Sequence, residues 1–123
     1  IRKEQTNDDV YGRFDPTRIK NDSGQRYPRS VIYFKTAESE GKTYHKTQKP
    51  IALLEYLINT YTKEGDVVLD NCMGSGSAAI AAINTNRNFI GFELDATYYN
   101  LAKERINKHI IDSNLQGTYT LLA

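Results

Sequence analysis

The residues with the clearest chemical potential form a glycine-rich stretch, Asp70-Asn71-Cys72-Met73-Gly74-Ser75-Gly76-Ser77. An apolar run at 67–69 precedes it and small residues follow at 78–83, which predicts a buried strand that turns directly into a helix. Glycines allow a positive φ and a close approach of the backbone to a ligand, and the start of a helix offers unpaired N–H donors. Such a turn is typical of a site that binds a phosphate or a carboxylate.

A second candidate is Glu93, which follows the apolar run 89–92 and lies nineteen residues after Gly74. An acidic side chain in that place can accept hydrogen bonds from both hydroxyls of a ribose. The glycine turn and Glu93 together predict a site for a nucleoside cofactor. Because the glycine pattern at 74–79 also fits a dinucleotide site, an oxidoreductase that uses NAD stays an alternative.

A third motif, Thr47-Gln48-Lys49-Pro50, lies upstream of an amphipathic segment. With this motif, the turn at 70–77 and Gly91-Phe92-Glu93 in that order, the chain resembles the permuted, beta-type DNA amino-methyltransferases over roughly residues 27–110. Those enzymes transfer a methyl group from S-adenosyl-L-methionine to the exocyclic amino group of adenine (N6) or cytosine (N4) in DNA. The resemblance implies an α/β, partial Rossmann-like methyltransferase fold with a parallel sheet flanked by helices.

The resemblance also implies which residues bind S-adenosyl-L-methionine. Thr47 and Lys49 would lie against the methionine end, Asp70 would order the glycine turn and Glu93 would bind the ribose. The implied cofactor-binding residues are Thr47, Lys49, Asp70, Cys72, Gly74, Ser75, Gly76, Ser77 and Glu93.

The chain departs from the family pattern at Lys46, where proline is common, and at Cys72, where an aromatic residue is common. Cys72 is interpreted as a small packing residue, since no base lies beside it in the sequence. Ser77 is predicted to be the N-cap of the helix after the turn, and Asp95 the N-cap of the next helix.

The family holds its target base with a short Asp-Pro-Pro-Tyr type motif, which this chain does not contain: Pro16, Pro28 and Pro50 are never adjacent. No catalytic residue is therefore assigned, and the catalytic half is expected upstream or in a partner chain. Residues 1–44 are interpreted as the loop-rich tail of a target-recognition or linker region, and residues 45–123 as the cofactor-binding half. The alternative is a non-catalytic regulatory module or subunit that binds S-adenosyl-L-methionine.

Charge is distributed unevenly along the chain. Residues 1–49 carry a net charge of +4 and residues 50–123 one of −3, within a formal total of +1. A basic segment can follow the phosphate backbone of double-stranded DNA, although a solvated irregular surface explains the same residues. The DNA-binding candidates are Arg13, Arg18, Lys20, Arg26 and Arg29.

The composition sets further bounds. A chain of 123 residues forms one domain at most, and no apolar run approaches a membrane span. A single cysteine, Cys72, excludes an internal disulfide and fits a reducing cytoplasm. His45 lies in no Cys, His or Asp cluster, so no metal site is expected. The sequence leaves a homodimer open.

Periodicity predicts the elements that position these residues. Helices are expected from Pro50 to Tyr61, at 77–84 and at 96–111, and strands at 30–35, 67–70, 88–92 and 118–122. Residues 1–30 and 37–42 are expected to be loops. Strands that alternate with helices indicate a parallel sheet.

Overall fold

The computed structural model describes residues 31–122, and the chain from Tyr33 onward belongs to one compact unit. Its elements are a 3₁₀ helix η1 (Ala37–Glu40), the helices α2 (Ile51–Tyr61), α3 (Ser77–Asn84) and α4 (Ala96–Asp112), and the strands β1 (Val67–Asp70) and β2 (Asn88–Gly91). The loop-rich segment expected at 1–30, with its five DNA-binding candidates, lies outside the described residues. The expected division of the chain between residues 44 and 45 stays a prediction.

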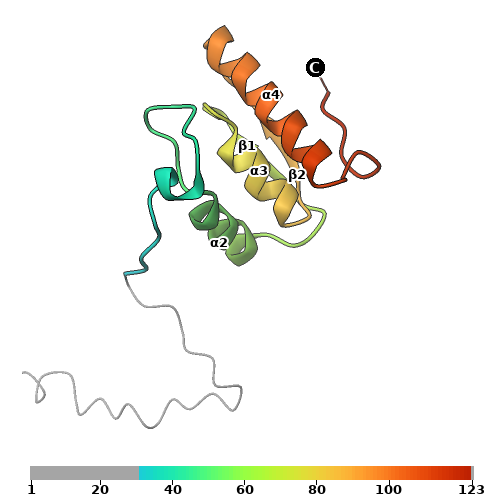
Figure 1. Ribbon diagram of the computed structural model, residues 1–123. Coiled ribbons are helices and arrows are strands. Elements are labelled where there is room, and N and C mark those ends of the chain that lie inside the picture. Colours follow the sequence, from blue (N-terminus) through green and yellow to red (C-terminus); the bar gives the residue numbers. More distant parts are fainter. Residues whose placement is uncertain (1–30, 123) are drawn as a thin grey trace, which may run out of the picture. The chain divides into compact units, whose positions relative to one another are not determined.

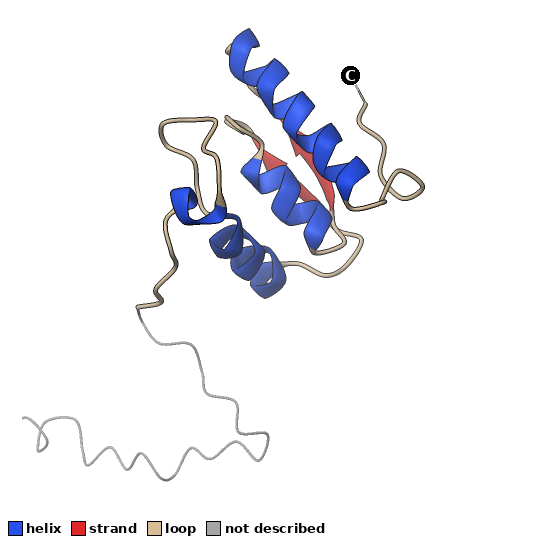
Figure 2. Ribbon diagram, viewed as in Figure 1, coloured by secondary structure: helices blue, strands red, loops and turns tan. Residues whose placement is uncertain are grey.

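The two strands pair in parallel, with Val67 opposite Asn88 and Asp70 opposite Gly91. Because parallel neighbours need a crossover, α3 connects β1 to β2 in a β–α–β unit. Figures 1 and 2 show that α2, α3 and α4 lie over the same side of these strands. The expected α/β architecture is confirmed.

Helix α3 forms the centre of the core. Three of its alanines, Ala79, Ala81 and Ala82, are at most 1% exposed. Their small side chains let neighbouring elements approach closely, and α3 packs on α2 through Ile58 and on α4 through Ile106. The small-residue run that follows the glycine turn therefore fixes α3 between two helices and the sheet.

A buried arginine closes the end of this core opposite the glycine turn. Arg87, only 6% exposed, donates hydrogen bonds to the carbonyl oxygens of Thr62 and Thr85 and to the Thr62 hydroxyl. Those threonines are the C-caps of α2 and α3. A cation is favourable at a helix C-terminus, so the guanidinium stabilises both helix ends.

Two expected strands are wrong. Residues 31–35 form no strand in the described part of the chain, and Val31 and Tyr33 are more than 80% exposed there. Residues 118–122 form no strand either, because the backbone N–H groups of Thr118 and Tyr119 both donate to the carbonyl of Leu115 in a turn. A β-prone sequence needs a partner strand to supply its ladder, and neither segment finds one among the described residues.

Two smaller expectations also change. Residues 37–40 form the short helix η1 rather than a loop. Ser77 is the first residue of α3 and not its N-cap, since Gly76 takes the N-cap position in the left-handed conformation. Asp95 is the N-cap of α4, as expected, and accepts hydrogen bonds from the backbone N–H groups of Thr97 and Tyr98.

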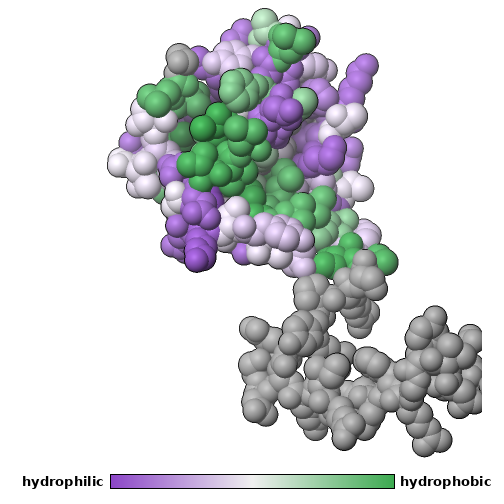
Figure 3. Space-filling view, turned by 180° about the vertical axis from the view of Figure 1, so that it is seen from behind, coloured by the Kyte–Doolittle hydropathy of each residue, from purple (hydrophilic) through white to green (hydrophobic). Residues whose placement is uncertain are grey.

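Within residues 31–122, no element covers the side of the sheet away from the helices. Apolar side chains are exposed there from β1 (Val67 55%, Leu69 63%), from β2 (Ile90 47%) and from Phe92 (58%), just after β2. Figure 3, seen from behind, shows a broad hydrophobic area on this side of the molecule. We call these four residues the bare sheet face.

Candidate functional site

The site forms where β1 and β2 end side by side. Beyond the last paired residues, the Phe92 N–H donates to the carbonyl of Asp70 and the Met73 N–H donates to the carbonyl of Phe92, both at 2.9 Å. The Asp70 carboxylate accepts a hydrogen bond from the Cys72 N–H, also at 2.9 Å. These bonds hold the glycine turn beside Glu93 and give Asp70 the ordering contact that the sequence suggested.

The two glycines of the turn have different tasks. Gly74 and Gly76 both take a positive φ, +52° and +75°, a backbone conformation that residues with a side chain rarely adopt. A Cβ on Gly76 would lie 3.0 Å from Ile106 Cδ1, so Gly76 lets α4 pack directly against the turn. A Cβ on Gly74 would lie at an ordinary 3.6 Å from the His45 ring, on the side where the turn is open.

Glu93 is hydrogen bonded on both carboxylate oxygens. It accepts from the Gly74 N–H at 2.8 Å and from the Asp95 N–H at 2.9 Å. These bonds, the one from Asp95 foremost, hold the pKa of Glu93 below its ordinary value of 4.5. A carboxylate has about four lone-pair sites, so this one keeps acceptor capacity for a ligand.

The opposite wall is a tight turn at 44–49. His45 Nδ1 accepts from the Thr47 N–H at 3.2 Å and lies 3.1 Å from the Thr47 hydroxyl. The Gln48 side chain accepts from the Tyr44 N–H at 3.0 Å, and Lys49 Nζ donates to the Thr47 carbonyl at 3.4 Å. The turn is therefore shaped by its own polar groups.

Glu40 connects the end of η1 to the start of α2, and the turn at 44–49 lies between them in the chain. The Glu40 carboxylate accepts hydrogen bonds from the N–H groups of Ile51 (2.6 Å) and Ala52 (2.9 Å). Pro50, at the N-cap, has no side-chain acceptor of its own, so Glu40, eleven residues before Ile51, supplies the acceptor. No local pattern in the sequence indicates this contact.

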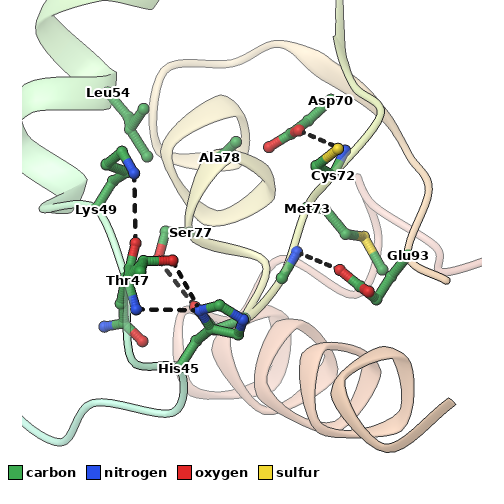
Figure 4. Close-up of a pocket in the computed structure, with 13 residues that line it drawn as sticks. His45, Thr47, Lys49, Leu54, Asp70, Cys72, Met73, Ser77, Ala78 and Glu93 are labelled. Atoms are coloured by element: carbon green, nitrogen blue, oxygen red, sulfur yellow. Dashed lines mark hydrogen bonds between the residues drawn. The ribbon is translucent and has the colours of Figure 1, made fainter. Parts of the chain in front are cut away.

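A cavity of about 280 Å³ lies between the two walls (Figure 4). Eight of the nine cofactor-binding residues that the sequence suggested line it: Thr47, Lys49, Asp70, Cys72, Gly74, Ser75, Ser77 and Glu93. Gly76 does not line it, since it faces α4. Cys72 is exposed at the cavity and does not pack in the core as expected.

The lining also includes residues that were not predicted from the sequence: His45, Gln48, Leu54, Met73 and Ala78. His45 and Gln48 flank the assigned Thr47, so the spacing of the third motif could have indicated them. Leu54 lies one turn into α2, and only the packing of that helix brings it to the cavity.

The two ends of the cavity differ in charge. Lys49 and Thr47 lie on one side, and Asp70 and Glu93 lie on the other (Figure 4). The first turn of α3 carries no acidic residue, so the positive end of its dipole is not neutralised from within the helix. The cavity therefore suits an elongated ligand with an anionic group at one end and hydroxyls at the other.

Other kinds of site are not found in the described part of the chain. Within residues 31–122, no three His, Cys, Asp or Glu side chains are grouped so that they could hold a metal ion. None of the helices described here combines the length and apolar character that crossing a membrane requires.

Comparison with known proteins identifies the family. A family model described as DNA methylase, of the N6/N4 type, matches residues 2–104, and the chain belongs to this family. This confirms the resemblance that the three motifs carried.

Individual relatives are similar over part of their length. The chain is 47% identical over 68 residues to the type II methyltransferase M.HindIII of Haemophilus influenzae, which is 55% of this chain and 22% of that protein. It is 38% identical over 74 residues to M.BglI of Bacillus subtilis, which is 60% of this chain and 21% of that protein. The chain thus spans about a fifth of the length of these curated relatives.

One solved structure supports the fold. The crystal structure of the M1.HpyAVI–SAM complex matches with a TM-score of 0.57 and 40% sequence identity, and the match covers 67% of this chain and 43% of that one.

Proposed function

We propose that this chain is the S-adenosyl-L-methionine-binding part of a DNA methyltransferase that methylates the exocyclic amino group of adenine or cytosine. The observation that carries the proposal is the cavity, which has Glu93 at one end and Lys49 with the start of α3 at the other. Membership of the DNA methylase family and the similarity to a SAM-bound relative support it.

The residues around the cavity suit the parts of this cofactor. Glu93 has free acceptor capacity for the two ribose hydroxyls. Lys49 and the N–H groups of the first turn of α3 are suited to the carboxylate of the methionine end. Once bound, the cofactor supplies an electron-poor methyl group, and the task of this chain is to hold it in a fixed orientation for the target nitrogen.

The base-holding half is proposed to lie in other parts of the enzyme. The described residues provide the cofactor cavity, and the chain matches only about a fifth of its curated relatives. The bare sheet face is the surface on which we expect the remaining part of such an enzyme to pack. Double-stranded DNA is the proposed substrate, and a reducing cytoplasm is the proposed location.

Calorimetric titration of the full chain with S-adenosylhomocysteine and with NAD tests the proposal. We expect S-adenosylhomocysteine to bind and NAD to show no saturable binding. Glu93→Ala should weaken the binding about tenfold or more, because a charged acceptor for two hydroxyls is removed.

Glu104→Ala is the matched control, since Glu104 is an exposed acid on α4 away from the cavity. Its affinity should equal that of the unmodified chain. Preferential binding of NAD would contradict the cofactor assignment, and an undiminished affinity of Glu93→Ala would contradict the role of Glu93.

A further inference from the structure

Arg105 of α4 contacts both walls of the cavity from behind. Its Nη1 donates to the Ser75 carbonyl at 2.9 Å, to Ser77 Oγ at 3.0 Å and, at 3.2 Å, to Ser75 Oγ. It also lies 3.5 Å from the Gln48 side-chain oxygen, and the guanidinium carbon lies 5.1 Å from the centre of the Tyr44 ring. One half-buried side chain thus connects α4 to hydrogen-bond partners that lie 28 to 57 residues before it in the sequence.

The position of this cation is electrostatically unfavourable within the fold itself. Arg105 lies at the N-terminal turn of α3, which already has positive potential. Arg87, by contrast, lies at two helix C-termini, where a cation stabilises the fold. Burial lowers the pKa of the Arg105 guanidinium, while Tyr44 and Glu40 act in the opposite direction. Stability of the fold alone therefore explains Arg87 better than it explains Arg105.

The contact also determines what the Ser77 hydroxyl can do. Because Ser77 Oγ accepts a hydrogen bond from Arg105, its own O–H is left to donate. The nearest acceptor recorded for it in the described residues is Ser75 Oγ, at a long 3.4 Å. Ser77 lines the cavity, so its hydroxyl is available as a donor to an anionic group there.

We propose that Arg105 is a positioning residue, which sets the Ser77 hydroxyl as a donor and adds positive potential for the carboxylate of the bound ligand. This inference rests on the proposed function, because it assigns the carboxylate end of the same cavity. Arg105 does not line the cavity and acts through Ser77 and the turn.

The test uses two ligands that differ only at the end in question. S-Adenosylhomocysteine carries the amino acid carboxylate, and 5′-methylthioadenosine keeps the adenosine but lacks that carboxylate. Arg105→Met should lower the affinity for S-adenosylhomocysteine about tenfold, as expected for loss of one charge-assisted contact. It should change the affinity for 5′-methylthioadenosine by no more than about twofold. Arg105→Lys keeps the charge but loses the planar fork, and should give an intermediate loss.

Two further variants complete the experiment. Lys108→Met removes an exposed cation from the same helix, and should change neither affinity. Ser77→Ala should make the effect of Arg105→Met on S-adenosylhomocysteine affinity smaller than in the unmodified chain, because one of the two hydroxyls that Arg105 contacts is then absent. If Arg105→Met does not fold, as judged by circular dichroism, Arg105→Lys carries the comparison of the two ligands.

Equal weakening of both ligands would show a merely structural role and overturn the inference, and so would unchanged affinity for both. Failure of the unmodified chain to bind either ligand would instead overturn the proposed function, and the inference with it.

Discussion

Glu93 joins the folding of the site to its chemistry. The same carboxylate that is proposed to bind a ribose also holds the glycine turn through Gly74 and the start of α4 through Asp95. Its two acceptor bonds are stronger in the ionised form, which is why its pKa lies below 4.5. Acid should therefore loosen the site by protonating this residue.

The sign of the pH effect follows from that shift. A carboxyl group whose pKa is lower in the folded state stabilises the fold at pH values above its pKa in the unfolded state. This stabilisation is lost as the pH falls through the pKa of the folded state. We expect Glu93→Gln to reduce the free energy of unfolding at pH 7, and we expect this difference to shrink steadily below pH 4.5. Urea unfolding at a series of pH values measures it.

Glu104→Gln, which removes an exposed acid from α4, is the control for the loss of one carboxylate. A difference between the unmodified chain and Glu93→Gln that stayed constant from pH 7 to pH 3.5 would contradict the assigned cause.

Among single residues, those with local signals were predictable from the sequence. Glu93 ends an apolar run, and Asp95 precedes a helical period, so each is marked by its neighbours. Arg105 and Glu40 were missed, because their partners lie 28 to 57 and 11 to 12 residues away. The spacing of neighbouring residues does not indicate which charged side chain will contact a segment far away in the sequence.

At the scale of elements, helices and strands with local signals were predicted correctly, and strands that depend on distant partners were not. The expected bounds of β1 and α3 are confirmed, and those of β2 and α4 differ by a single residue, because turns and caps delimit them locally. The two wrong strands, at 30–35 and 118–122, have strand-like composition but lack a partner strand in the described chain. Strand formation depends on pairing with a neighbouring strand, and the composition of a segment does not show whether such a partner is present.

Helix α2 offers a test of a contact that only the fold reveals. Glu40→Ala removes both acceptors for the first N–H groups of α2, and should lower the free energy of unfolding by about 1 kcal/mol, the usual value of a helix cap. The loss should also loosen the turn at 44–49, and so weaken the binding of S-adenosylhomocysteine. Urea unfolding and calorimetry measure the two effects.

Glu64→Ala is the matched control, because Glu64 is an exposed acid in the turn after α2. It should change neither quantity. Stability of Glu40→Ala equal to that of the control would mean that the Glu40 contact contributes nothing to the fold.

At the scale of the whole molecule, the arrangement of layers is one-sided. The three α-helices of the described residues lie on one side of the sheet, and the bare sheet face exposes four apolar residues on the other (Figures 1 and 3). Contiguous apolar surface of this kind marks a contact surface in folded proteins. In the relatives the matched region is about a fifth of a longer chain, so a covering layer from the rest of such an enzyme is the natural complement.

The chain studied by itself should therefore cover this face with a second copy. We expect sedimentation velocity to show association that increases with protein concentration. Leu69→Lys should reduce it, because Leu69 is 63% exposed at the centre of the face and a buried unpaired charge is costly. Since Leu69 points away from the helical core, the affinity for S-adenosylhomocysteine should not change.

Asn107→Lys adds the same charge at an exposed position of α4. It therefore separates an effect of net charge from an effect of placing the charge on the bare sheet face. If both variants reduced association equally, general repulsion would explain the result. If the unmodified chain stayed monomeric at every concentration, the bare face would not be a contact surface between copies. Loss of association in Leu69→Lys alone would locate the contact on the sheet, on the side that the cofactor cavity does not use.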